Sequence, residues 1–224
     1  MRRFIPIFLL LALAVFACGR RDGLSPAERA IIRQSDSVMY VLVLQDATDS
    51  VILRTPSRDL PKEVLAGEDF RTLGAKMLAT VQSPEQGGVG IAAPQVGLNV
   101  RLIAVWRGDK PGEPFGLYPN VHVDSLWGPL ASGPEGCLSY PPYRGLVPRY
   151  PNAIVSYVDP VTLEARKDTV SGYTAIIFQH ECDHLDGIMY IDRADTVFLN
   201  PAWEAERAAF DFSKPAWLEE LLKQ

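Results

Sequence analysis

The sequence predicts an α+β fold, in which mostly antiparallel strands surround a central helix that carries the run His180-Glu-Cys-Asp-His184. An apolar stretch that begins at Thr174 leads into this run, and Gly187 follows it at a position typical of a helix end. Several segments outside this helix have the apolar and β-branched pattern of short strands. These observations place the two histidines on a helix inside a single core.

The other elements follow from local patterns. The run Ser25–Glu28 offers an N-cap serine, a proline at the first helical position and a glutamate at the third, so a helix is expected to about Tyr40. A buried apolar stripe predicts a second helix over Glu68–Gln82. Strands are expected over residues 100–106, 121–126, 153–158 and 165–170. Beyond Asp195 the sequence indicates one or two terminal helices, divided near Pro215.

Length and composition fit one enzyme domain with extensions. The chain has 224 residues, of which 47% are hydrophobic, enough for one core of roughly 150 to 170 residues. The formal net charge is −5, and the lysines and arginines are scattered, which argues against a nucleic-acid-binding protein. Three cysteines in separate contexts argue against a disulfide framework.

The run from His180 to His184 predicts a metal site. Histidines four residues apart lie one turn above each other on a helix, so both imidazoles can reach one ion. Glu181 then lies beside the metal, where it can handle the protons of a bound water. Taken alone, the run could also be a helix with two surface histidines; the apolar stretch before it and Gly187 after it favour the metal site.

A third protein ligand is chosen by elimination. His122 lies in an alternating strand pattern, in which histidine more often packs or faces solvent than binds metal. Cys182 is two residues from either histidine, about 200° around the helix, and should face the core. Cys137 lies in a glycine-rich stretch that leaves its thiol accessible. The expected ligands are therefore Cys137, His180 and His184, with one water.

Three runs resemble, in the same order, the signature motifs of the peptide deformylase family. They are Gly88-Val-Gly-Ile-Ala-Ala-Pro-Gln95, Glu135-Gly-Cys-Leu-Ser139 and His180-Glu-Cys-Asp-His184. Three ordered motifs are far more specific than any one of them, and the resemblance extends over residues 44–195. The departures at Tyr140, Pro142 and 173–175 lie near the expected positions of substrate side chains, so they bear on specificity rather than chemistry.

The resemblance implies a metal-dependent enzyme that removes the formyl group from formyl-methionyl peptides and releases formate. Glu181 would be the general base, while the Gln95 side chain and the Leu138 N–H would stabilise the oxyanion. The resemblance also implies substrate binding by Gly88, Val89, Gly90 and Glu135. The resemblance implies Fe(II) as the working ion, with Zn(II) able to occupy the same site, and a thiolate ligand favours these two ions over Mg²⁺ or Mn²⁺. The alternative is a non-catalytic or retargeted membrane-anchored relative that binds peptides or metal.

The N-terminus resembles a bacterial lipoprotein signal. Arg2 and Arg3 precede a 14-residue apolar run, Phe4–Ala17, which is short for a membrane span and ends at Cys18. Lipidation of Cys18 would anchor an exported protein to a membrane; a cytoplasmic location is the alternative. The expected organisation is a signal segment at 1–18, a linker with a helical extension at 19–43, a catalytic domain at 44–195 and a C-terminal helical extension at 196–224.

Overall fold

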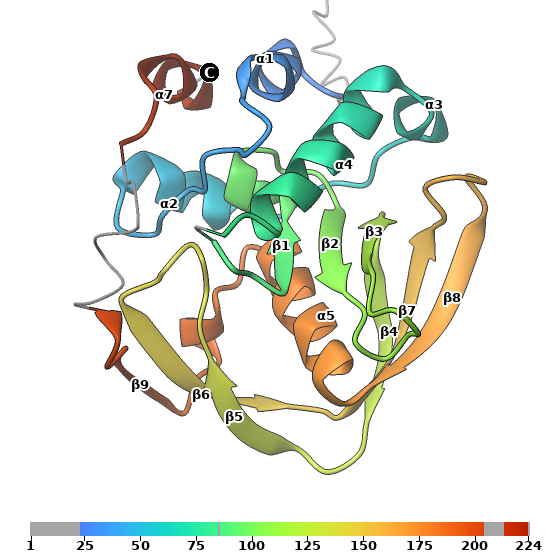
Figure 1. The fold of residues 1–224 in the computed structure, drawn as a ribbon, viewed down its shortest axis with the longest axis vertical. Coiled ribbons are helices and arrows are strands. Elements are labelled where there is room, and N and C mark those ends of the chain that lie inside the picture. Colours follow the sequence, from blue (N-terminus) through green and yellow to red (C-terminus); the bar gives the residue numbers. More distant parts are fainter. Residues whose placement is uncertain (1–22, 85, 204–212, 224) are drawn as a thin grey trace, which may run out of the picture.

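Three antiparallel sheets of three strands surround one buried helix, α5 (Gly172–Leu185), which confirms the predicted α+β fold (Figure 1). This computed structural model describes residues 23–84, 86–203 and 213–223. The helix that carries both histidines therefore lies at the centre of the molecule, and the sheets and remaining helices form layers around it.

The first sheet separates two apolar cores. It contains β1 (Gly90–Ala92), β2 (Leu102–Trp106) and β3 (Phe115–Pro119), in the order β1-β2-β3. Leu102 and Ala104 pack into the core beneath the helical layer, whereas Ile103 and Val105 pack into the core around α5. Because successive side chains of a strand point to opposite faces, burial on both faces requires the continuous apolar run seen in β2.

Two further sheets enclose the other sides of α5. The second contains β4 (His122–Trp127), β7 (Asn152–Val158) and β8 (Ala165–Ser171), in the order β4-β7-β8. The third contains β5 (Ala131–Glu135), β6 (Tyr143–Arg149) and β9 (Thr196–Leu199), in the order β5-β6-β9. The four expected strands are confirmed as β2, β4, β7 and β8, with ends shifted by one or two residues.

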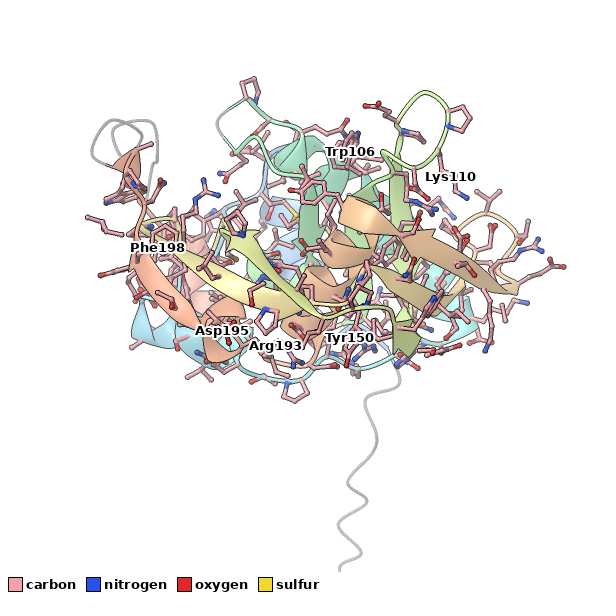
Figure 2. All side chains as sticks on the ribbon, turned by 90° about the horizontal axis from the view of Figure 1, so that it is seen from below. Trp106, Lys110, Tyr150, Arg193, Asp195 and Phe198 are labelled. Atoms are coloured by element: carbon pink, nitrogen blue, oxygen red, sulfur yellow. The ribbon has the colours of Figure 1, made fainter. Side chains whose placement is uncertain are left out.

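The start of the C-terminal extension differs from expectation, because Thr196–Leu199 forms β9 rather than a helix. Its threonine, valine and phenylalanine favour extended backbone, and antiparallel pairing with β6 supplies the hydrogen bonds. In Figure 2, Phe198 of β9 lies on the left side of the molecule, and Asp195, just before β9, lies nearer its middle. The third sheet thus continues past the boundary expected at residue 195, and the helical extension begins later.

The helices form a layer on the first sheet. They are α1 (Pro26–Gln34), α2 (Ala47–Leu53), α3 (Lys62–Leu65), α4 (Glu68–Val81) and α7 (Ala216–Leu222), with 3₁₀ turns at Ala93–Val96 and Tyr190–Asp192. The expected helix at 68–82 is confirmed as α4, and α7 begins directly after Pro215, as expected. In Figure 1, α7 lies beside α1 and above α2, and it is in contact with both. The helix α1 also contacts α4.

The first helix has the predicted start but ends sooner than expected. Ser25 and Glu28 form a reciprocal capping box, yet α1 ends at Gln34 instead of continuing to about Tyr40. At Ser35 the backbone changes to an extended conformation. Four residues later, the Met39 N–H donates a hydrogen bond to the buried Thr80 hydroxyl at 2.8 Å. This tertiary hydrogen bond replaces further helical bonds, which a local pattern cannot predict.

Candidate metal centre and active site

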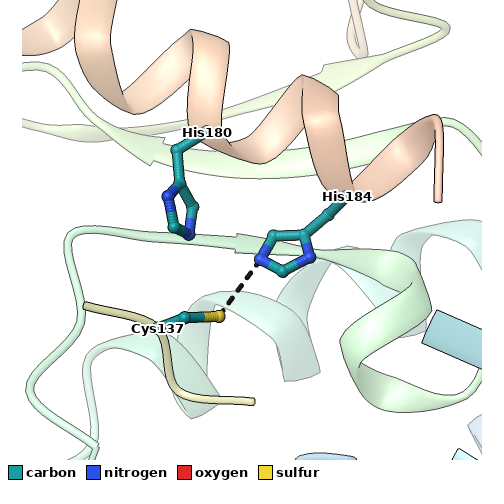
Figure 3. Close-up of side chains that lie close together, drawn as sticks. All are labelled: Cys137, His180 and His184. Carbon is teal, nitrogen blue, oxygen red and sulfur yellow. Dashed lines mark hydrogen bonds between the residues drawn. The ribbon is translucent and has the colours of Figure 1, made fainter. Parts of the chain in front are cut away.

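Three potential metal ligands converge from two segments of the chain (Figure 3). His180 and His184 project from successive turns of α5, and Cys137 comes from the loop after β5. The Cys137 Sγ lies 3.2 Å from the His184 Nε2, and the ligand atoms of all three residues lie within 4.8 Å of one another. The structure therefore brings together the ligand set expected from the sequence.

A buried carboxylate fixes the orientation of His180. Its Nδ1 lies 2.8 Å from Glu135 Oε2. Burial alone would raise the pKa of Glu135, but hydrogen bonds from His180 and Arg149 lower the pKa to about 2. Because an ionised carboxylate only accepts hydrogen bonds, Nδ1 must carry a proton, and in the neutral ring Nε2 is then the nitrogen that can bind a metal. Glu135, expected among the substrate-binding residues, thus has a hydrogen-bonding role toward His180.

Charged residues behind Glu135 extend this support. Arg149 donates to Glu135 from Nε at 2.8 Å and to Asp183 from Nη1 at 2.6 Å. Asp183 also accepts two hydrogen bonds from Arg193, at 2.6 and 2.7 Å. Since Asp183 lies between the two histidines in the sequence, the network ties α5 to β6 and to the loop that carries Cys137.

Glu181 lies beside the potential ligands in a dry environment. Burial raises the pKa of this carboxyl group to about 7, so its proton affinity is close to that of a base working near neutral pH. Its Oε2 is buried and has no hydrogen-bond partner in the described part of the chain. A Cβ at Gly90 would overlap the Glu181 carboxylate and approach the Ile177 side chain to 2.8 Å. Glycine at position 90 therefore makes room for Glu181, a constraint in addition to any role in binding.

The Gln95 side chain has a fixed orientation. Its Oε1 accepts a hydrogen bond from the Ala92 N–H at 2.8 Å, so its NH₂ group points the other way. That Nε2 lies 3.2 Å from the Ser139 Oγ and 3.7 Å from the Cys137 Sγ. The amide donor thus faces the cysteine loop, where the resemblance implied an oxyanion donor.

Unused backbone groups also border the site. Among the described residues, the Leu138 N–H donates to no protein acceptor, although Leu138 lies next to Cys137. β1 is an edge strand: it pairs with β2 on one side, and its first residue, Gly90, lines the cavity together with Gly88 and Val89 before it. An open strand edge can pair with an extended peptide. Glycine at position 88 lets the backbone pack closely against Val81 and Leu138, because a Cβ there would meet the Val81 side chain at 3.0 Å and the Leu138 side chain at 3.2 Å.

These residues surround a cavity of about 540 Å³. Of the site residues expected from the sequence, those that line the cavity are Gly88, Val89, Gly90, Gln95, Glu135, Cys137, Leu138, His180 and Glu181. His184 lies deeper, with 1% of its surface exposed. The cavity is also lined by residues that the sequence did not single out for this site, among them Tyr143, Arg144, Ile176, Ile177 and Asn200.

The donor set fits a transition metal. One thiol and two imidazoles suit Fe(II) or Zn(II) better than Mg²⁺, which prefers oxygen ligands. The Glu181 Oε2 also agrees with a metal at this place. A buried polar atom normally has a hydrogen-bond partner, and a water held beside a metal would supply one for this oxygen. The structure and the donor chemistry agree on a catalytic type of centre, with three protein ligands and room for water.

The remaining sequence candidates lie away from this centre. The His122 Nε2 lies 3.1 Å from Asp59 Oδ1 on an exposed part of β4. Cys182 packs in the core around α5, where burial raises the pKa of its thiol and keeps it neutral. Of the positions that depart from the family pattern, Tyr173 lines the cavity, and Tyr140 stacks on Tyr143 with ring centroids 4.9 Å apart.

Comparison with known proteins gives a consistent result. The family model for polypeptide deformylase matches residues 40–199. The chain is 37% identical over 156 residues to a peptide deformylase of Leptospira biflexa, covering 66% of this chain and 85% of that one. It is 39% identical over 138 residues to peptide deformylase 2 of Nostoc sp., covering 58% of this chain and 74% of the relative.

A solved structure extends the likeness to three dimensions. The class I type b peptide deformylase from Acinetobacter baumannii with bound Met-Ala-Ser matches with a TM-score of 0.61 and 31% identity. The match covers 70% of this chain and 98% of that one. The N-terminal and C-terminal parts of this chain, residues 1–39 and 200–224, lie beyond the family match.

The two cysteines of this region provide a test of the ligand set. Cys137→Ala should lose metal affinity sharply, because it removes the only sulfur ligand, whereas Cys182→Ala should keep the metal and lose about 1–2 kcal/mol of unfolding free energy. Metal titration and urea unfolding of both variants measure the two effects. The opposite pattern, with metal lost from Cys182→Ala alone, would show that the ligand set is wrong.

Proposed function

Because this chain belongs to the polypeptide deformylase family, we propose that its cavity hydrolyses the formamide bond of formyl-methionyl peptides and releases formate. The observation that carries this proposal is the convergence of Cys137, His180 and His184 beside a buried, unpartnered Glu181 carboxylate. A module that only binds peptides has no need of a general base at this place. The Met-Ala-Ser tripeptide bound by the Acinetobacter baumannii relative supports a peptide ligand in the cavity.

We propose Fe(II) as the working ion, with Zn(II) able to occupy the same ligands. A cysteine ligand is softer than a carboxylate, which favours these ions over Mg²⁺ or Mn²⁺. Cys137, His180 and His184 would hold the ion, and Glu135 would keep His180 in the ligating tautomer. When bound, the ion supplies a Lewis acid that polarises the formyl carbonyl and makes water more acidic.

Glu181 would move the protons of the reaction. Its raised pKa allows the carboxylate to accept a proton from the attacking water and, at the next step, to return one to the leaving nitrogen. That return is necessary because an amide nitrogen cannot leave as an anion. Because Gly90 has no side chain, the Glu181 carboxylate can occupy the space where a Cβ at that position would lie.

Gln95 and Leu138 would stabilise the negative charge that develops on the formyl oxygen. The Gln95 Nε2 donor is fixed by the bond between its Oε1 and Ala92, and the Leu138 N–H is free of protein acceptors among the described residues. Preorganised donors of this kind cost no reorganisation during the reaction. Beyond the formyl group, the peptide backbone would pair with the segment that leads into the open edge of β1, at Gly88, Val89 and Gly90.

Replacement of Glu181 by glutamine separates proton transfer from metal binding. Glu181→Gln should keep its fold and metal but lose activity by about 10²- to 10⁴-fold, because an amide cannot act as the base. Formate release from formyl-Met-Ala-Ser, measured together with metal content, tests this expectation. If the variant instead lost metal and its remaining activity followed occupancy, Glu181 would be a ligand and not the base.

For the N-terminus we propose a lipid anchor at Cys18. Residues 1–22 lie outside the described part of the chain, and no helix within that part is long and apolar enough to cross a bilayer. The support comes from the sequence: two arginines, an apolar run and the Ala17-Cys18 junction. A diacylated cysteine would hold the enzyme at a membrane surface and leave the cavity in water.

The anchor predicts the form of the mature protein. Mass spectrometry of protein from its native host should find Cys18 as the first residue with attached acyl chains, and the protein should sediment with membranes. Cys18→Ser should release the protein from the membrane or leave it uncleaved. A soluble protein that begins at unmodified Met1 would show that the segment is not a lipoprotein signal and would restore the cytoplasmic alternative.

A further inference from the structure

The C-terminal extension contributes a buried cation to the domain. Lys214, just before α7, places its Nζ 2.6 Å from Asp49 Oδ1 and 3.1 Å from Asp46 Oδ1. The Lys214 side chain is 7% exposed and that of Asp49 is 0% exposed. Burial alone would lower the pKa of Lys214, but its ion pairs with the two carboxylates raise the pKa. A buried carboxylate of this kind needs a cation or several hydrogen bonds.

Asp49 also organises the chain before α2. Its second oxygen, Oδ2, accepts a hydrogen bond from the Val43 N–H at 3.0 Å. Asp46 caps α2, because its Oδ1 accepts from the N–H groups of Thr48 and Asp49 at 2.8 and 3.0 Å. Lys214 therefore balances the charge of two carboxylates that fix the start of α2 and the segment preceding it.

That segment joins the two loops that carry the oxyanion donors. The Leu42 N–H donates to the Gln95 carbonyl and the Leu44 N–H to the Ser139 carbonyl, each at 2.8 Å. Between them, the Val43 N–H donates to Asp49. Three consecutive N–H groups thus bind the Gln95 loop, the Lys214–Asp49 pair and the loop after Cys137. In the described residues, Gln95 is connected to the loop after Cys137 in two ways. Its side chain contacts Cys137 and Ser139 directly, and its carbonyl is joined to that loop through the segment 42–44.

We propose that Lys214 is a positioning residue for the deformylation reaction, acting through Asp49 and the segment 42–44 on the oxyanion donors Gln95 and Leu138. This inference rests on the proposed function of these two donors. Lys214 lines no part of the cavity and touches no potential metal ligand, so its effect reaches the reaction only through backbone position. The C-terminal extension is then a part of the catalytic domain's support and not an appended segment.

The test compares Lys214→Met with Lys223→Met in the full chain. Both changes remove one positive charge near α7, but Lys223 pairs with Glu219 on the same exposed helix. Lys214→Met should lower kcat for formyl-Met-Ala-Ser about ten-fold, with KM and metal content nearly unchanged, because a small displacement of oxyanion donors weakens transition-state binding. Lys223→Met should match the wild type.

A double variant guards against simple loss of folding. Lys214→Met leaves the buried Asp49 carboxyl group without its cation, whereas Asp49→Asn with Lys214→Met removes both members of the ion pair and keeps an oxygen that can accept the Val43 N–H. The double variant should therefore recover most of the lost kcat. Hydrogen exchange should be faster at the Leu42 and Leu44 amides in Lys214→Met and return toward wild type in the double variant.

Three results would overturn the inference: wild-type kcat in Lys214→Met, equal losses in Lys214→Met and Lys223→Met, or a loss that follows metal content. The hydrogen-exchange measurement does not depend on activity. If the wild-type protein released no formate, the proposed function would fail, while faster exchange at Leu42 and Leu44 would still establish the connection from Lys214 to the two loops.

Discussion

The contact between His180 and Glu135 is the interaction on which the rest of the site depends. A carboxylate held ionised by Arg149 keeps a proton on the His180 Nδ1, so in the neutral ring Nε2 is the nitrogen with a lone pair for the metal. The same carboxylate belongs to the strand that leads into Cys137. One buried group thereby sets the tautomer of one ligand and the position of another, and each remaining feature of the site is built around that arrangement.

Burial of α5 explains how these groups work together. Because α5 is packed between sheets, protein groups surround Glu181 in place of water. This burial raises the pKa of the Glu181 carboxyl group to the range useful for a base. The cost is that charged groups near the helix must be paired, which accounts for the chain of contacts from Glu135 through Arg149 to Asp183 and Arg193. Glycine at position 90 is also necessary, since any side chain there would displace the Glu181 carboxylate.

The sequence predicts those parts of the molecule that local patterns determine. The helix of the two histidines, the helix α4 and four strands follow from periodicity, and counting histidines and cysteines leads to Cys137 as a ligand. The partner of His180 could not be predicted, because Glu135 lies 45 residues away and reaches it only through the fold. The same applies to β9, whose pairing with β6 outweighs a helical expectation, and to Lys214, whose partners lie far away in the sequence.

The central claim is that one sulfur and two ring nitrogens hold the catalytic ion, and X-ray absorption spectroscopy at the metal edge tests it most directly. Protein lacking residues 1–18 and loaded with Fe(II) or Zn(II) should give a first coordination shell with one sulfur and two imidazole nitrogens, completed by oxygen. Imidazole scattering should persist, and the sulfur contribution should disappear in the Cys137→Ala protein at saturating metal. A shell without sulfur in the unaltered protein, or one with three imidazoles that includes His122, would contradict the account.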